Sequence, residues 1–278
     1  MPSNVSEADL AHWRTWIGRM ETRVERLSID AARRFAAAIG EDLDVERTQP
    51  SLVHWAYFLP VPGADELGPD GHTKRGGFQP PVSLQRRMFA AAEMHFATPL
   101  ALGREAVFTA VIADIKHRAG RSGDLVFVEV ERAIDQDGVR CVRERQTIVY
   151  RDAGERTPPV EDRAVAPATG QVAWRPDVVD LFRFSAATFN GHRIHYDASY
   201  ARDEEFYPGL VVHGPFIAAK LFGYARGRAG RELRRFSFRA QAPVFVGPAL
   251  RLAPGEADGI VEALRCDGAV AMSAAYRP

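Results

Sequence analysis

Two polar segments in the second half of the chain carry residue types that suit acid–base chemistry. Residues 189–197 contain Asn190 and His195, and a later His213-Gly214 step opens an apolar stretch. Histidine titrates close to neutral pH and can shuttle protons. A backbone N–H at the start of a helix can stabilise a developing negative charge. Together the two segments are candidates for proton transfer beside an anionic centre.

Each of these side chains also has a simpler interpretation. Taken alone, His195 is more readily a structural histidine, and Asp197 fits the N-cap of a short helix that begins near Ala198. A three-histidine metal site can be imagined from His192, His195 and His213, but their spacing matches no standard metal motif. We therefore expect no metal ion and no cofactor.

The stretch after His213 predicts a helix from about Val211 to Tyr224 that is apolar on nearly all sides, so it must be buried. Strand-like runs follow this helix and suit an antiparallel sheet that wraps around it. The second-half strands are expected at residues 181–187, 235–245, 249–253, 259–266 and 269–276.

The first half repeats this order of helices and then strands. Asp137-Gly138 predicts a hairpin turn between two of its strands. Helices are expected at residues 10–20, 30–39 (ended by Gly40) and 82–94, and strands at 53–59, 106–115, 123–133 and 142–150. The fold class is therefore α+β with two similar halves.

A segment rich in proline, glycine and charge separates the halves and reads as a linker. We expect an N-terminal domain at 1–155, a linker at 156–175 and a C-terminal domain at 176–278. The first half lacks a counterpart of the Asn190 to His195 pattern, which predicts one active site per chain. The long loop from Pro60 to Gly71 is of a kind that is often functional.

Composition excludes several classes of protein. The 278 residues are 46% hydrophobic and 26% charged, which is typical of a globular protein. Thirty-six basic and 36 acidic residues give zero net charge, so no electrostatic argument favours nucleic acid or an anionic membrane. Cys141 and Cys266 are too few for a disulfide framework. Without a visible signal peptide or a run of roughly 18 apolar residues, we expect a cytoplasmic location.

Residues 189–197 and 207–215 resemble the signature of the R-specific enoyl-CoA hydratase (MaoC-like) family, which is Asp-x-Asn-Pro-apolar-His-x-Asp followed by apolar-His-Gly. The resemblance covers most of the chain and points to a branch with mitochondrial-type 3-hydroxyacyl-thioester dehydratases and bacterial mesaconyl-C4-CoA or itaconyl-CoA hydratases. It implies two tandem hot-dog domains, each an antiparallel sheet wrapped around a central helix. The first-half stretches that carry it are His54–Pro60, Glu66–His72, Arg75–Phe78 and Gly120–Gly123.

The resemblance also implies roles for three residues. His195 occupies the catalytic histidine position, and Gly214 the glycine whose amide meets the thioester carbonyl. Asn190 stands where the general signature has a catalytic Asp, although asparagine is usual in this branch. An amide cannot take a proton, so the implied acid–base is His195, with Asn190 orienting the water and the Gly214 amide as the oxyanion contact.

Other side chains are candidates for substrate binding. Arg193 and Arg239 could hold a coenzyme A phosphate or could be solvated, and His213 is expected to shape the helix entry. Arg86, with its neighbour Arg87, could pair with a free carboxylate on the acyl group, although charge on a helix surface is the simpler interpretation.

The first half is expected to lend its helix and loop to the acyl pocket. Trp55, together with Phe58 and Phe78, could line that pocket, and core packing is the simpler alternative.

The leading hypothesis for function is hydration of a short, branched, dicarboxylic enoyl-CoA, with mesaconyl-C4-CoA giving citramalyl-CoA as the specific expectation. The alternatives are a 3-hydroxyacyl-thioester dehydratase of fatty-acid metabolism and a non-catalytic acyl-thioester-binding module, which Asn190 leaves open. The expected partner is an acyl-CoA substrate, without nucleic acid or membrane, and a homodimer would be compatible with the fold.

Overall fold

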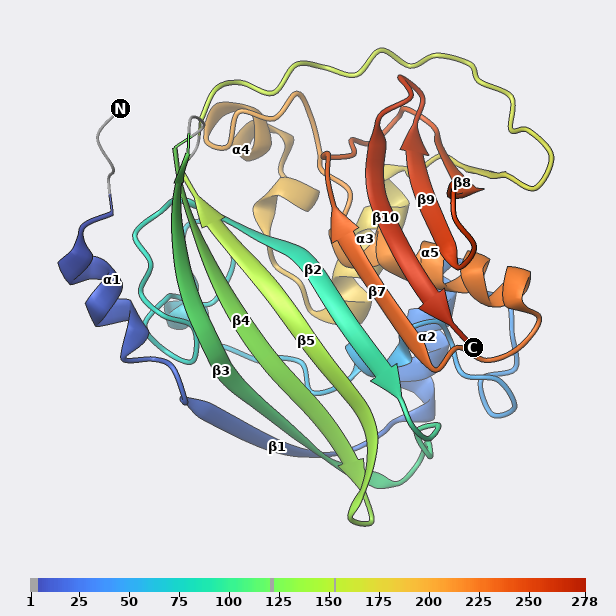
Figure 1. Ribbon diagram of the computed structural model, residues 1–278, viewed down its shortest axis with the longest axis horizontal. Helices are drawn as coiled ribbons and strands as arrows, with labels where there is room; N and C mark the ends of the chain where they lie inside the picture. Colours follow the sequence, from blue (N-terminus) through green and yellow to red (C-terminus); the bar gives the residue numbers. More distant parts are fainter. Residues whose placement is uncertain (1–4, 121–122, 153) are drawn as a thin grey trace.

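A single antiparallel sheet of ten strands organises the chain in the computed structural model, which describes residues 5–120, 123–152 and 154–278 (Figure 1). The strand order is β1-β3-β4-β5-β2-β7-β10-β9-β8-β6. Five strands come from each half, and the pairing of β2 with β7 joins the halves edge to edge.

The first-half strands are β1 (Met20–Arg26), β2 (Arg86–Phe96), β3 (Glu105–Gly120), β4 (Gly123–Gln136) and β5 (Val139–Arg151). The second-half strands are β6 (Val172–Trp174), β7 (Arg235–Ala240), β8 (Leu250–Pro254), β9 (Ile260–Arg265) and β10 (Val270–Arg277). The tight turn between β4 and β5 is the expected hairpin, in which Asp137 and Gly138 both have positive φ angles, of 50° and 77°.

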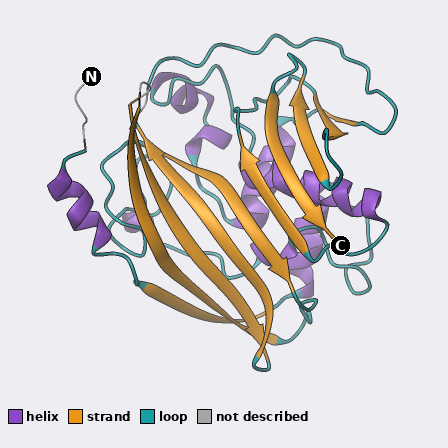
Figure 2. Ribbon diagram, viewed as in Figure 1, coloured by secondary structure: helices purple, strands orange, loops and turns teal. Residues whose placement is uncertain are grey.

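Helices lie together on one face of the curved sheet (Figure 1 and Figure 2). These are α2 (Ile29–Ile39), α3 (Val178–Thr188) and α5 (Gly214–Ala229). The others are α1 (Glu7–Arg14), which lies beside β3, α4 (Ala198–Asp203), and the 3-10 helices η1 (Val53–Ala56), η2 (Ala64–Glu66) and η3 (Arg193–His195). None of the helices in these described ranges is both long enough and apolar enough to cross a bilayer.

Helix α5 is the buried central helix expected in the second half. Its apolar residues, among them Phe216, Ile217 and Leu221, are almost inaccessible to solvent and pack on β7 to β10 and on β2. The helix begins at Gly214, three residues later than predicted, and ends at Gly230 in the left-handed conformation. Burial of such side chains supplies roughly 1.5–3 kcal/mol each, so this helix anchors the second half.

Helix α2 begins after the N-cap Ser28 and ends at Gly40, as predicted. Its buried face, which includes Phe35 and Ile39, packs against α3 and η1. The two halves of the chain therefore share one layer of helices.

Three predicted elements were wrong in type. Residues 82–94, expected as a helix, enter strand β2, because hydrogen bonding to β5 on one side and β7 on the other outweighs local propensity. Residues 53–59, expected as a strand, contain η1 at their start and no strand. Residues 181–187, also expected as a strand, lie in α3, whose start is fixed by a capping box between Asp177 and Asp180.

The ends of the first domain also differ from expectation. The predicted helix at 10–20 stops at Arg14, and the chain enters edge strand β1 at Met20. Residues 155–171 contain neither helix nor strand, in keeping with a linker, but the last part of the predicted linker forms β6 and pairs with β8. The domain limits at 155 and 176 remain predictions. Arg121 and Ser122 lie outside the described residues.

Candidate active site

A cavity of about 1410 Å³ lies between the sheet and the loops at residues 57–79 and 189–196. Its walls come from both halves, with apolar side chains such as Phe108 and Ile134 from the first half. The three residues expected to be catalytic, Asn190, His195 and Gly214, all border it. The structure therefore brings together two segments that are separated by about twenty residues in the sequence.

His195 is the last residue of η3 and is only 7% exposed. Its Nδ1 lies 2.7 Å from the carbonyl oxygen of Val211. Because a carbonyl oxygen can only accept, Nδ1 carries the hydrogen and the lone pair resides on Nε2. Within the described part of the chain, Nε2 has no hydrogen-bond partner. The ring is thus held in the tautomer that can accept a proton.

His213 packs face to face on His195, with ring centroids 3.6 Å apart. The Nε2 atom of His213 is 2.9 Å from the hydroxyl of Ser185, which anchors the ring from the side of α3. Burial, followed by the neighbouring His213 and His192, holds the pKa of His195 well below its usual range. Burial, with a contribution from His192, lowers the pKa of His213 to about 3. Both rings are therefore neutral at neutral pH.

Asn190 follows α3, at a bend where Phe189 adopts a left-handed backbone conformation with φ of 48°. Its side-chain oxygen accepts a hydrogen bond of 3.0 Å from the backbone N–H of His192. This bond fixes the amide and still leaves one lone pair and two N–H donors for other partners. Asn190 can therefore hold a water molecule by hydrogen bonding.

Gly214 is the first residue of α5, where backbone N–H groups have no acceptor within the helix. The amide also lies at the positive end of the helix dipole. The carbonyl of Phe89 on β2 is the nearest neighbour, at 3.5 Å from where a side chain would begin. An anionic oxygen in the cavity would find a preformed donor at this position.

A loop of the first half closes over this region. The carbonyl of Asp70 accepts a 2.9 Å bond from the N–H of Arg193, and that of Pro69 accepts 3.0 Å from its guanidinium. Gly71 has φ of +83°, and a Cβ atom there would lie 1.9 Å from the carbonyl oxygen of Gly191. Only glycine permits this approach, so the crossing of the two loops depends on Gly71.

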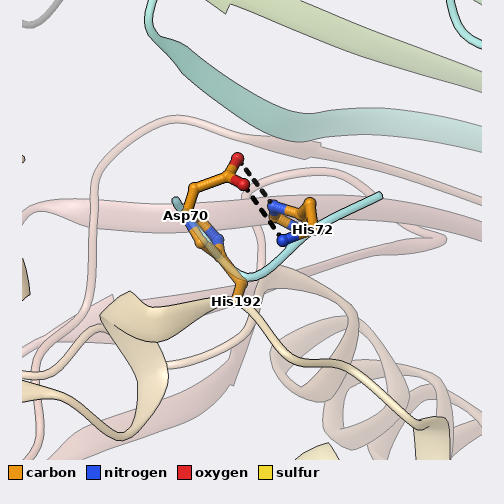
Figure 3. A group of neighbouring side chains, drawn as sticks. All are labelled: Asp70, His72 and His192. Carbon is orange, nitrogen blue, oxygen red and sulfur yellow. Dashed lines mark hydrogen bonds and ion pairs between the residues drawn. The ribbon is translucent and has the colours of Figure 1, made fainter. Parts of the chain in front are cut away.

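Asp70, His72 and His192 meet at this crossing (Figure 3). Asp70 accepts bonds of 3.0 and 3.2 Å from the backbone N–H and Nδ1 of His72, whose ring lies 4.1 Å from that of His192. The Nε2 atom of His192 lies 3.0 Å from a carboxylate oxygen of Glu205. Burial and the charge of Arg87 lower the pKa of His72 to about 3.

The same three residues offer donor atoms within 4.8 Å of one another, close enough to hold a metal ion. However, Asp70 and His192 already use their side chains in hydrogen bonds, and the positive charge of Arg87 is close by. The group is better explained as a hydrogen-bonded frame for residues 190–195. Sequence reasoning missed it, although His72 lies in a stretch that carried the family resemblance.

The other predicted binding residues have mixed placements. Trp55 borders the cavity, and its indole N–H donates to Glu144 at 3.0 Å; Phe58 and Phe78 also line it. Arg193 pairs with Asp197 at 2.8 Å and does not border the cavity.

Three further predictions can be compared with the structure. Arg239 is exposed on β7 and does not border the cavity. Asp197 is the N-cap of α4, as preferred from the sequence. The expectation of helix-surface charge for Arg86 was wrong: it is 1% exposed on β2, stacks 4.8 Å over the ring of Tyr207 and donates to the carbonyl of Glu205.

Comparison with known proteins identifies the family. Residues 52–246 match the family described as hydroxyacyl-thioester dehydratase type 2. A mesaconyl-C(4)-CoA hydratase of Chloroflexus aurantiacus is 45% identical over 272 residues, covering 95% of this chain and 97% of that protein. The chain belongs to the hydroxyacyl-thioester dehydratase type 2 family. A mitochondrial family member from Schizosaccharomyces pombe is 26% identical over 246 residues, covering 79% of this chain and 82% of that protein.

Solved structures agree on the fold of this family member. A MaoC-like dehydratase of Phytophthora capsici has a TM-score of 0.67 at 12% identity, covering 98% of each chain. A Mycobacterium tuberculosis protein described as having a double hot-dog fold has a TM-score of 0.58 at 11% identity, covering 94% of this chain and 95% of that one. The predicted α+β architecture of two hot-dog halves is therefore confirmed. The relatives are hydratases and dehydratases, so the chain is an enzyme of the lyase type.

Proposed function

We propose that this enzyme adds water reversibly to the double bond of mesaconyl-C4-CoA to form citramalyl-CoA. Support comes from the high identity to a hydratase named for that substrate over nearly the whole chain. The observation that carries the chemistry is the hydrogen bond from His195 Nδ1 to the Val211 carbonyl, because it leaves the lone pair on Nε2 available. Coenzyme A enters as part of the substrate, and the proposed reaction uses no other cofactor.

The proposed reaction balances with a single acid–base residue. Nε2 of His195 takes a proton from water as the water oxygen bonds to the β-carbon of the acyl group. The π electrons shift to the thioester carbonyl, and the resulting enolate oxygen accepts a hydrogen bond from the Gly214 amide. The imidazolium then returns the proton to the α-carbon, which completes hydration and restores neutral His195.

The low pKa of His195 has a specific consequence in this scheme. It ensures that the basic form is present before substrate binds. As negative charge develops on the enolate, that charge favours the imidazolium and raises the basicity of the ring. Asn190 orients the water through its free lone pair without itself taking the proton.

A second candidate function is dehydration of longer 3-hydroxyacyl thioesters in fatty-acid metabolism. The cavity of about 1410 Å³ exceeds the roughly 300–1,000 Å³ typical of small-ligand sites, which leaves room for more than a five-carbon acyl group. The family description also names this activity.

The discriminating experiment mixes purified protein separately with mesaconyl-C4-CoA, crotonyl-CoA and a long-chain trans-2-enoyl-CoA, and follows loss of the conjugated enoyl-thioester absorbance. Fast loss with mesaconyl-C4-CoA alone supports the proposal. Fast loss of absorbance with the long-chain substrate would instead support the fatty-acyl dehydratase activity. Binding without turnover on all three would indicate an acyl-thioester-binding module. The cytoplasmic location and a homodimer remain predictions.

A further inference from the structure

Arg87 borders the same cavity as Asn190, His195 and Gly214. It lies on β2, two residues before Phe89, whose carbonyl faces the start of α5. The charge of Arg87 also acts on His72, which packs against His192 at the crossing of the loops. A guanidinium therefore stands at the wall of the cavity close to His72.

A buried tyrosine helps to orient this guanidinium. Arg87 is the cross-strand partner of Tyr150 on β5, and the Tyr150 hydroxyl interacts with it. The same hydroxyl lies 3.3 Å from the side-chain oxygen of Gln79, so it donates to Gln79 and presents a lone pair to Arg87. The buried Tyr150 hydroxyl thus helps to position the Arg87 side chain.

Arg87 has no carboxylate partner among the described residues, since no ion pair joins it to an acidic side chain there. The charge of Arg87 helps to lower the pKa of Asp70, but the Asp70 carboxylate accepts its hydrogen bonds from His72. The adjacent Arg86 contacts the carbonyl of Glu205 and the ring of Tyr207, and it does not border the cavity. A guanidinium at the edge of a largely apolar cavity is costly to desolvate unless an anion joins it.

We infer that Arg87 binds the free carboxylate of a dicarboxylic acyl thioester and so determines which acyl group the site accepts. In mesaconyl-C4-CoA that carboxylate is attached to the carbon that receives the water oxygen. A planar guanidinium can hold a carboxylate through two parallel hydrogen bonds. The pair would orient the β-carbon toward His195 and discriminate against acyl groups that carry a methyl group in its place. This inference rests on the proposed function and names its specificity residue.

The test uses saturated ligands that cannot react. Saturated 2-methylsuccinyl-C4-CoA and 3-methylbutanoyl-CoA differ only in a carboxylate replaced by a methyl group. Their Kd values are measured by calorimetry for the wild-type protein, for Arg87→Met, and for the control Arg143→Met, which removes an exposed arginine from β5. We expect Arg87→Met to raise the Kd of the dicarboxylic ligand on the order of 100-fold and to leave the Kd of the neutral ligand unchanged. Arg143→Met should change neither.

The inference would be overturned if Arg87→Met weakened the binding of both ligands equally, or if it did not weaken the binding of the dicarboxylic ligand. If that variant fails to fold, Tyr150→Phe provides the second test. It removes the hydroxyl that positions Arg87, and it should raise the Kd of the dicarboxylic ligand selectively.

The two proposals fail separately. Arg87-dependent binding of the dicarboxylic ligand without hydration of mesaconyl-C4-CoA would refute the proposed reaction and keep the role of Arg87. Full hydration activity in Arg87→Met would refute the role of Arg87 and keep the proposed reaction.

Discussion

The imidazole ring of His195 lies flat on that of His213, with centroids 3.6 Å apart and planes inclined by 21°. His213 is in turn tied to Ser185, and His195 is tied at its edge to the Val211 carbonyl. The ring that carries the free Nε2 is therefore fixed before any substrate arrives. Such preorganisation favours proton transfer because little rearrangement is needed.

Replacing His195 with glutamine should remove proton transfer. We expect kcat/KM for enoyl-CoA hydration to fall by roughly 10²–10⁴-fold. Steady-state kinetics measures the loss, and circular dichroism checks that the variant is folded. His95→Gln, on an exposed part of β2, is the matched control and should retain wild-type turnover. Near-native activity in His195→Gln would remove His195 from the mechanism.

His213 should make stability depend on pH. Its pKa is about 3 in the folded protein, against roughly 6.5 when unfolded, so the unfolded state binds more protons between those values. Its contribution is complete above pH 6.5 and is lost as the pH falls toward 3. At pH 5 the loss is about 2 kcal/mol. Urea unfolding at pH 7 and pH 5 should show a smaller difference in His213→Gln than in the wild-type protein. Equal differences in both proteins would contradict this assignment.

Gly71→Ala should separate the two loops that cross at the site. The new methyl group would overlap the Gly191 carbonyl, and alanine disfavours φ of +83°. We expect a loss of roughly 3 kcal/mol in the free energy of unfolding, together with reduced activity. Gly209→Ala is the control, because nothing lies within 4 Å of its added methyl group. Similar thermal stability of Gly71→Ala and Gly209→Ala would show that the close crossing is dispensable.

Asn190 should tolerate aspartate better than an apolar residue. A carboxylate can still accept the hydrogen bond from the His192 N–H, and it would raise the pKa of His195 by its charge. We expect Asn190→Asp to keep at least about a tenth of wild-type kcat, with its acidic limb moved to higher pH, and Asn190→Leu to lose roughly 100-fold. A pH–rate profile of each variant measures both effects. If leucine were as active as aspartate, Asn190 would not orient the water.

The class of fold and the residues proposed for the chemistry were predictable from the sequence alone. Asn190, His195 and Gly214 follow one another in a fixed local order, and such spacing is visible without a structure. The apolar circumference of α5 required burial, and alternation along β4 predicted an antiparallel sheet. These signals lie within single segments of the chain, so they can be recognised without a structure.

The residues that surround this motif are set by contacts between distant parts of the chain. Residues 82–94 became a strand because two neighbouring strands pair with them, and this change turned Arg87 toward the cavity and Arg86 toward Glu205. Asp70 and His72 join His192 only because Gly71 allows one loop to lie against the other. Contacts across more than a hundred residues depend on the packing of the whole sheet, and no local pattern in the sequence records them.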